Sequence, residues 1–141
     1  HACVMRRVHE MNVPFVSVGI RSLDKPQFEY IQDNELQVIT PKQIESDPDW
    51  INRIVDRLSD HVYITLDIDG LDPSIAPGTG TPEPGGLSYR QVVNLILQIG
   101  RTKKIVSADI VEVIPQIAGV ITEFLAARLA YNIIAAAQIK K

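Results

Sequence analysis

Short apolar runs alternate along this chain with segments whose apolar residues recur at helical spacing. The runs predict four β-strands, over residues 13–20, 36–40, 62–66 and 104–111. Helical patterns cover residues 41–58 with one interruption, residues 88–100 and residues 120–138. Strands that alternate with helices are typical of a parallel sheet covered by helices. We therefore predict an α/β fold in which the four strands form half of a doubly wound sheet.

Local signals mark where the helices should begin. Asp47 is expected to cap a helix that has Pro48 in its first turn, and Ser88 is expected to cap the next one. Between the third strand and Ser88, residues 72–86 contain four prolines and four glycines. This composition predicts a long loop.

Composition narrows the class of protein. The 141 residues are enough for one domain, and the net charge of −3 is too small to suggest a nucleic-acid partner. Cys3 is the single cysteine, which excludes an internal disulfide and fits a reducing compartment, so we expect a cytoplasmic protein. Glu123 and Arg128 interrupt the most apolar stretch, residues 117–139, and charges there argue against a membrane span.

The sequence Asp67-Ile68-Asp69 directly follows the third strand. If the strand continued, both carboxylates would lie on one face with their α-carbons about 7 Å apart. They would lie at the carboxyl end of the strand, where open α/β sheets bind ligands. Carboxylate oxygens favour Mg²⁺, Mn²⁺ or Ca²⁺. The alternative is structural: one aspartate caps the following turn and the other pairs with an arginine.

A longer stretch resembles the signature of a known family. Residues 67–73 (DIDGLDP) with residues 76–88 (APGTGTPEPGGLS) resemble the ureohydrolases, a family that includes arginases, agmatinases and guanidinobutyrases. Residues 107–115 (SADIVEVIP) resemble the second C-terminal motif of that family. Residues 18–21 (VGIR) also fit, as does His1 with Arg6 behind it.

The resemblance implies a three-layer α/β/α fold with a parallel sheet, and it implies roles for individual residues. Asp67 and Asp69 match two of the six ligands that hold two Mn²⁺ ions. Glu112 matches the acid that binds the guanidinium group of the substrate, through paired hydrogen bonds. His1 matches the histidine that carries a proton to the leaving amine.

Departures from the family pattern limit what this chain should do alone. Ala2 and Ile114 stand where the family usually has Gly and Asn. The other four ligands belong to two motifs, of the types Gly-Gly-Asp-His and Asp-Ala-His-x-Asp, that precede His1 in family order. We therefore expect residues 1–141 to be the C-terminal part of a single ureohydrolase domain, inactive in isolation.

Seven further polar residues are expected to be structural. Two histidines should lie at the surface, Asp72 should shape the turn before Pro73, and Asp109 should make a structural hydrogen bond. Three arginines should form salt bridges. The histidines are His9 and His61, and the arginines are Arg6, Arg21 and Arg90.

The expected activity is hydrolysis of agmatine to putrescine and urea, because Glu83 looks more like agmatinases than arginases. The alternatives within the family are an arginase, a guanidinobutyrase and an aminopropylagmatine ureohydrolase. The resemblance also implies a homo-oligomer, trimer or hexamer. An alternative of another class is a non-catalytic assembly or regulatory fragment. A Mg²⁺-dependent phosphotransfer domain is disfavoured because the chain has no Gly-x-x-x-x-Gly-Lys phosphate loop.

Overall fold

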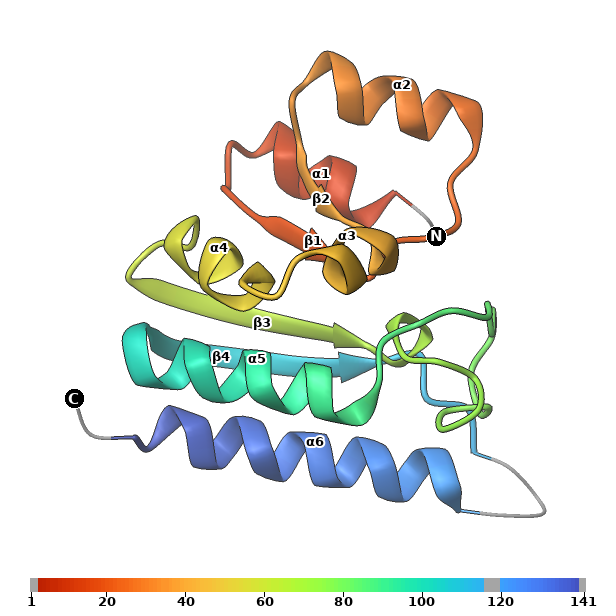
Figure 1. Ribbon diagram of the computed structural model, residues 1–141, viewed down its shortest axis with the longest axis vertical. Coiled ribbons are helices and arrows are strands. Elements are labelled where there is room, and N and C mark those ends of the chain that lie inside the picture. The colour runs from red at the N-terminus through yellow and green to blue at the C-terminus, as the bar shows by residue number, and fades with distance from the viewer. Residues whose placement is uncertain (1–2, 116–119, 140–141) are drawn as a thin grey trace.

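The computed structural model describes residues 3–115 and 120–139. Helices and strands alternate over most of this range (Figure 1), which confirms the predicted α/β class. In chain order the elements are α1 (Val4–Glu10), β1 (Val16–Val18), α2 (Lys25–Asp33), β2 (Gln37–Ile39), α3 (Pro41–Ser46), α4 (Trp50–Asp56), β3 (His61–Asp67), the 3₁₀ turn η1 (Ile68–Gly70), α5 (Tyr89–Thr102), β4 (Lys104–Val111) and α6 (Ile121–Ala137).

The strands form two separate parallel pairs, β1 with β2 and β3 with β4. Within the described residues no ladder joins β1 to β3, so the four strands do not make the single half-sheet that the sequence suggested. Tyr63 lies opposite Ser107 and Asp67 opposite Val111, with a shift in register after Val62. Both β3 and β4 point toward the end of the molecule where the loop 72–86 lies (Figure 1).

The core lies between the β3–β4 pair and helices α4, α5 and α6. Along β3, Val62 and Leu66 are buried while Tyr63 and Thr65 on the opposite face are exposed. This alternation is the period of two that a strand imposes. The main core cluster includes Ile44, Trp50, Ile54, Leu66, Ile68, Leu71, Val92, Val93, Ile96, Leu129 and Ile133.

Several helices begin where a side chain caps the first turn. Ser88 accepts a hydrogen bond from the Gln91 backbone at the start of α5, as predicted. The prediction that Asp47 caps the next helix is wrong, because α4 begins after Asp49, which makes no side-chain cap. Asp47 instead accepts from the Asp49 backbone (2.9 Å) and pairs with Arg53 (2.7 Å). The hydrogen bond from Arg53 lowers the pKa of Asp47.

Helix α2 was not predicted, although the sequence carries a signal for it. Asp24 accepts from the Gln27 backbone (2.7 Å) and the Gln27 side chain accepts from the Asp24 backbone (3.0 Å), which is a capping box. Pro26 lies in the first turn. The helix buries none of its residues fully, so it lacks the apolar stripe on which helix prediction mainly depends.

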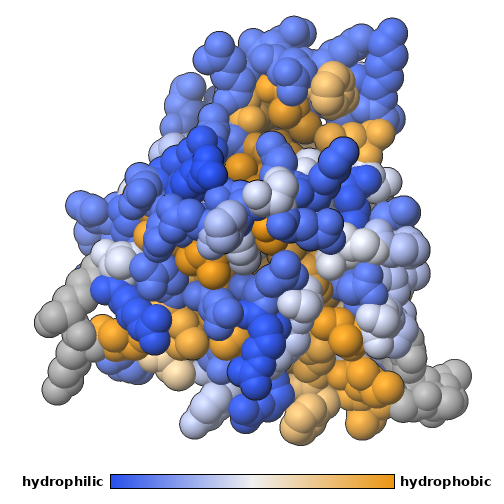
Figure 2. All heavy atoms as spheres, in the orientation of Figure 1, coloured by the Kyte–Doolittle hydropathy of each residue, from blue (hydrophilic) through white to orange (hydrophobic). Residues whose placement is uncertain are grey.

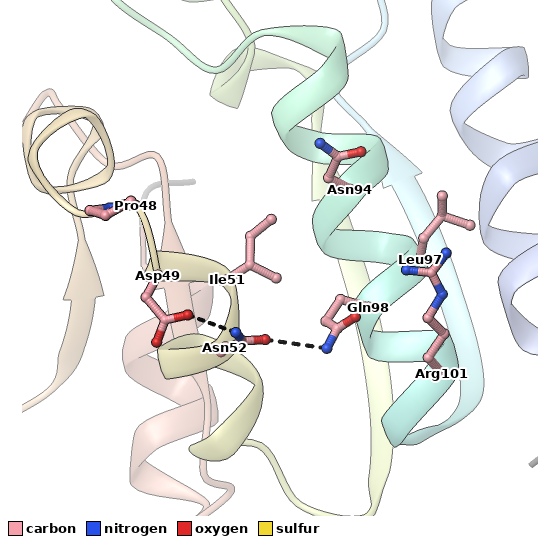
Figure 3. Close-up of a pocket in the computed structure, with 8 residues that line it drawn as sticks. All are labelled: Pro48, Asp49, Ile51, Asn52, Asn94, Leu97, Gln98 and Arg101. Atoms are coloured by element: carbon pink, nitrogen blue, oxygen red, sulfur yellow. Dashed lines mark hydrogen bonds between the residues drawn. The ribbon is translucent and has the colours of Figure 1, made fainter.

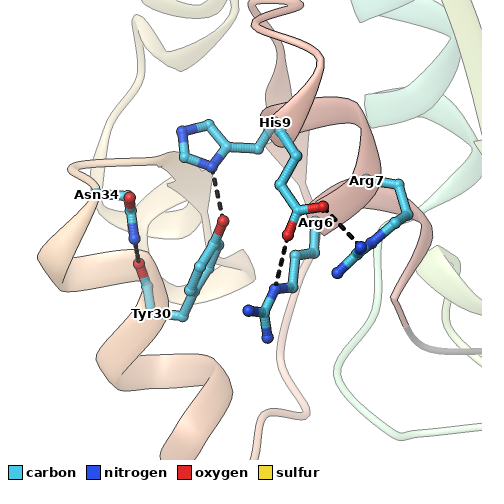
Figure 4. Close-up of polar contacts among 6 residues, drawn as sticks. Arg6, Arg7, His9, Tyr30 and Asn34 are labelled. Atoms are coloured by element: carbon cyan, nitrogen blue, oxygen red, sulfur yellow. Dashed lines mark hydrogen bonds and ion pairs between the residues drawn. The ribbon is translucent and has the colours of Figure 1, made fainter.

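Helices α1 and α2 are joined by a polar contact between their side chains (Figure 4). His9 Nδ1 and the Tyr30 hydroxyl are hydrogen-bonded at 2.8 Å, and the Arg6 guanidinium lies 4.8 Å from the centre of the Tyr30 ring. Glu10 pairs with Arg6 (3.2 Å) and Arg7 (2.7 Å). His9 is half-buried and hydrogen-bonded to Tyr30, where the sequence suggested a surface residue.

Helix α6 is apolar on more than one side. It buries Leu129 and Ile133 against the core, yet large apolar residues on its outer side are exposed. Figure 2 shows apolar side chains gathered along the lower edge of the molecule, where α6 lies in Figure 1. Among the described residues, no helix combines the length and apolar character that a bilayer span requires.

Helices α5 and α6 approach closely at Gly100. A Cβ atom there would lie 2.5 Å from the backbone oxygen of Ala136. Replacing Gly100 by Ala in the full-length protein should therefore force the helices apart and lower the free energy of unfolding by about 1–3 kcal/mol. Urea unfolding measures this. Arg101→Ala, an exposed change in the same helix, is the matched control, and equal stability of the two variants would contradict the packing described here.

Candidate metal centre

Strand β3 ends at Asp67, and the chain then turns through η1. The Asp67 carboxylate accepts a hydrogen bond from the Asp69 backbone (2.9 Å), which favours the turn. The prediction that Asp67 and Asp69 share one face of a continuing strand is therefore wrong in its geometry. The turn nevertheless keeps both carboxylates at the carboxyl end of β3.

The Asp69 carboxylate has one oxygen engaged and one oxygen without a partner. Its Oδ2 accepts a hydrogen bond from the Thr81 hydroxyl. Its Oδ1 is buried and has no hydrogen-bond partner among the described residues. A buried carboxylate oxygen without a donor is costly unless a cation meets it. This oxygen therefore fits a position beside a metal ion.

Asp67 lies in a crowded anionic environment. Desolvation raises the pKa of its carboxyl group, and the negative charges of Asp69 and Glu112 raise it further. The carboxylates of Asp69 and Glu112 are thus close enough to Asp67 to repel its charge. In the part of the chain that the structure describes, no three Asp, Glu, His or Cys side chains are arranged to hold a metal by themselves. Asp67 and Asp69 fit part of a site for a hard divalent cation, with ligands still to come from elsewhere.

Glu112 follows the end of β4 in an unusual backbone conformation. Its φ angle is +64°, in the left-handed region that non-glycine residues rarely adopt and that costs about 1–3 kcal/mol. The Thr79 hydroxyl donates to the Glu112 carbonyl (2.9 Å), and the Ile114 backbone donates to the Gly78 carbonyl (2.8 Å). A Cβ atom on Gly80 would lie 3.7 Å from the Glu112 carboxylate. The loop 77–81 thus lies directly against Glu112.

The other end of the loop closes back on η1. Leu87 donates its backbone N–H to Gly70 (3.0 Å) and accepts one from Asp72 (3.0 Å). The Asp72 carboxylate accepts from the backbones of Ser74, Gly85 and Gly86 at 3.0, 2.9 and 3.2 Å. A hydrogen bond with the Ser74 side chain, together with these backbone bonds, lowers the pKa of Asp72 to about 2. The predicted turn-shaping role of Asp72 is confirmed.

The remaining candidates have structural partners or lie outside the site. Asp109 accepts hydrogen bonds from the Thr65 hydroxyl (2.7 Å) and the Tyr63 hydroxyl, as predicted for a structural residue. The bond to Asp109 raises the pKa of Tyr63. Arg21 makes no salt bridge among the described residues and binds backbone carbonyls instead. His1 lies outside the described residues.

A pocket of about 340 Å³ lies between α4 and α5 (Figure 3), away from the carboxylates. Asn52 bridges its two walls, donating to Asp49 (2.7 Å) and accepting from Gln98 (3.2 Å). Asp67, Asp69 and Glu112 are not among the residues that line this pocket. We therefore place the candidate site at the strand ends and not in this pocket.

Sequence reasoning missed the residues that hold the candidate site in shape. Thr79, Thr81 and Arg21 contact Glu112 or Asp69 without being acids or ligands themselves. The available signal was their position in the sequence: Thr79 and Thr81 lie in residues 76–88 and Arg21 in residues 18–21, which both resemble the family. Asp24, which lies close in sequence to Arg21, uses its carboxylate as the cap of α2.

Comparison with known proteins agrees with this arrangement. The model of the Arginase family matches residues 1–136. The chain belongs to the arginase family. This arginase-family chain is 36% identical over 134 residues to an N(1)-aminopropylagmatine ureohydrolase from Synechocystis, covering 94% of itself and 44% of that protein. It is 33% identical over 134 residues to an agmatinase from Pyrococcus horikoshii, covering 95% of itself and 47% of the agmatinase.

Solved structures show the same fold for the arginase-family chain. An agmatine ureohydrolase from Thermoplasma volcanium superposes with a TM-score of 0.86 at 36% identity, over 98% of this chain and 47% of that one. The arginase from Bacillus caldovelox gives a TM-score of 0.79 at 31% identity, over 89% and 43%. The chain spans less than half the length of these relatives.

The charge on Asp72 should hold the loop closed. Because the pKa of Asp72 is lowered to about 2, its contribution to stability is present above the ordinary aspartate pKa of about 3.9 and is lost as pH falls toward 2. Asp72→Asn in the full-length protein should therefore lower the urea midpoint at pH 7, and the difference from wild type should shrink between pH 4 and pH 2. Asp56→Asn, an exposed change on α4, is the control. A difference that stays constant over that pH range would contradict this role.

Proposed function

We propose that the intact protein is a Mn²⁺-dependent ureohydrolase that splits a guanidinium substrate into urea and an amine. The observation that supports this most directly is the buried Asp69 Oδ1, which has no donor and lies in a cluster of three carboxylates. Two Mn²⁺ ions, when bound, lower the pKa of water and supply a nucleophile near neutral pH. Asp67 and Asp69 would hold them together with ligands from outside residues 1–141.

Glu112 would bind the substrate. Its carboxylate lies near the two aspartates proposed as metal ligands, because it contributes to the raised pKa of Asp67. A guanidinium group is a planar cation whose N–H groups can donate two parallel hydrogen bonds to one carboxylate. The left-handed backbone of Glu112, held by Thr79, would fix the direction of the side chain before substrate arrives.

The reaction needs a water, a proton donor and an oriented guanidinium carbon. Water adds to that carbon and forms a tetrahedral adduct. The bond from carbon to the alkylated nitrogen then breaks, giving urea and an amine that takes up a proton. His1 would deliver this proton, since a histidine titrates near neutral pH.

Agmatine is the proposed substrate. A site that offers no partner to the α-carboxylate of arginine would have to desolvate that group unpaired, which disfavours arginine. Glu83 lies exposed in the loop 72–86, where its negative charge would repel a carboxylate and attract an amine. The second candidate is an aminopropyl derivative of agmatine, because relatives from Synechocystis and Thermococcus kodakarensis are named N(1)-aminopropylagmatine ureohydrolases. In cells the enzyme would be a cytoplasmic homo-oligomer.

The first test removes the metal ligands. Asp67→Ala and Asp69→Ala, each made in the full-length protein, should lose most bound Mn²⁺ and nearly all urea release while the circular dichroism spectrum is kept. Elemental analysis after dialysis measures the metal. Asp33→Ala, an exposed change in α2, should keep full metal content. Full Mn²⁺ content in both ligand variants would refute the assignment.

A second test separates substrate binding from proton transfer. Glu112→Gln keeps the shape and removes the charge, so KM should rise by about 10- to 100-fold, the value of a hydrogen bond between charged groups. His1→Asn should mainly lower kcat, by about 10²- to 10⁴-fold. Steady-state kinetics at saturating Mn²⁺ distinguish the two effects. Unchanged kinetics in either variant would remove that residue from the mechanism.

The third test concerns substrate choice. Urea release from agmatine, N(1)-aminopropylagmatine, guanidinobutyrate and arginine should be compared with one enzyme preparation. We expect kcat/KM for agmatine or its aminopropyl derivative to exceed that for arginine by about 100-fold or more, because an unpaired carboxylate is costly to desolvate. Glu83→Gln should reduce this ratio of kcat/KM values. A higher kcat/KM for arginine would overturn the proposed substrate class.

A further inference from the structure

Arg21 binds backbone carbonyl groups from three separate segments. Its Nη1 donates to Gly19 (3.2 Å), in the turn after β1. Its Nη2 donates to Asp69 (2.8 Å) and Leu71 (3.3 Å), in and after η1. Its Nε donates to Glu83 (3.0 Å) and Pro84 (3.2 Å), and Nη2 also donates to Glu83. One guanidinium group thus joins β1, η1 and the loop 72–86.

The contact with Asp69 carries the functional consequence. The backbone carbonyl of Asp69 is held by Arg21, and its carboxylate Oδ2 is held by the Thr81 hydroxyl. With the peptide and one carboxylate oxygen fixed, the position of the buried Oδ1 is fixed as well. The Arg21 guanidinium and the Thr81 hydroxyl therefore leave Oδ1 as the free, oriented atom that could bind a metal.

A lysine could not replace this set of contacts. The guanidinium group has five N–H donors in a rigid plane, whereas an ammonium group is a single point with three donors. The carbonyls of Asp69, Glu83 and Gly19 lie around Arg21 at distances that only a branched, planar donor can reach together. Arg21 pairs with no carboxylate in the described part of the chain, and its guanidinium group is hydrogen-bonded to these backbone carbonyls instead.

We propose that Arg21 is a positioning residue for the Asp69 carboxylate and thereby sets the affinity of the site for Mn²⁺. This rests on the proposed function, in which Asp69 is a metal ligand. Arg21 donates to backbone carbonyls and would act on the metal through Asp69. Residues that orient a metal ligand typically change metal affinity by about 10- to 100-fold when they are replaced.

The experiment is a titration of the metal-free, full-length protein with Mn²⁺ alone, followed by calorimetry. Arg21→Lys and Arg21→Gln should weaken Mn²⁺ binding by about 10- to 100-fold while far-UV circular dichroism remains that of wild type. Arg21→Lys keeps the charge and is the variant more certain to fold. Arg90→Gln, an exposed change on α5, is the matched control and should bind Mn²⁺ as wild type does.

A second readout separates positioning from general stabilisation. Activity of Arg21→Lys should be low at limiting Mn²⁺ and should recover at saturating Mn²⁺, with the substrate KM there within about twofold of wild type. A folded Arg21→Lys variant with wild-type Mn²⁺ affinity would overturn the inference, whether or not its unfolding temperature had fallen.

The failure of this inference can be told from failure of the proposed function. Wild-type protein that binds Mn²⁺ but releases no urea from any guanidinium substrate refutes the proposed function, while the titration of the Arg21 variants still decides the role of Arg21. Wild-type protein that binds no Mn²⁺ refutes both.

Discussion

Asp67, Asp69 and Glu112 bring negative charge together at the carboxyl ends of two parallel strands, and the surrounding structure is arranged around that repulsion. Desolvation and like charge already raise the pKa of Asp67, and Asp69 Oδ1 is buried without a donor. Such a cluster destabilises the fold unless positive charge enters it. In this family member the opposing charge would come from divalent cations and, during turnover, from the guanidinium substrate.

The loop 72–86 keeps those carboxylates in place through hydrogen bonds from its threonine side chains and through bonds that close the loop. The hydroxyl groups of Thr79 and Thr81 donate to Glu112 and Asp69. On the far side of the loop, Asp72 accepts from the Gly86 backbone, and Arg21 joins the Glu83 carbonyl to that of Asp69 in η1. The loop also allows close approaches that a side chain would prevent. At Gly86, for example, a Cβ atom would lie 2.4 Å from the Leu71 backbone. The loop is therefore packed closely against the residue that follows η1.

Regular elements could be predicted where one physical signal dominates. The sequence showed the apolar periodicity of α5, the long apolar stretch of α6, the apolar run of β3 and the Ser88 cap. The turn at η1 was not predicted. The alternation of strand side chains suggested that the strand continues through Asp69, but the Asp69 backbone N–H donates to the Asp67 carboxylate and the chain turns. The contacts of Arg21 with η1 and the loop join residues 48 to 63 positions apart, and no local pattern reports such contacts. The family motif identified Asp67, Asp69 and Glu112, but only the structure revealed what holds them.

The most direct test of the carboxylate cluster is the stability that Mn²⁺ confers on the full-length protein. Wild type should be compared with an Asp67→Asn, Asp69→Asn double variant, in which the amide oxygens can keep both local hydrogen bonds and lose the charge. With Mn²⁺ at 100 times its dissociation constant, the free energy of unfolding of wild type should rise by about 2.7 kcal/mol for each ion bound. The double variant should gain nothing, and without metal it should be at least as stable as wild type. An equal gain in both proteins, or no gain in either, would contradict a cation-dependent cluster.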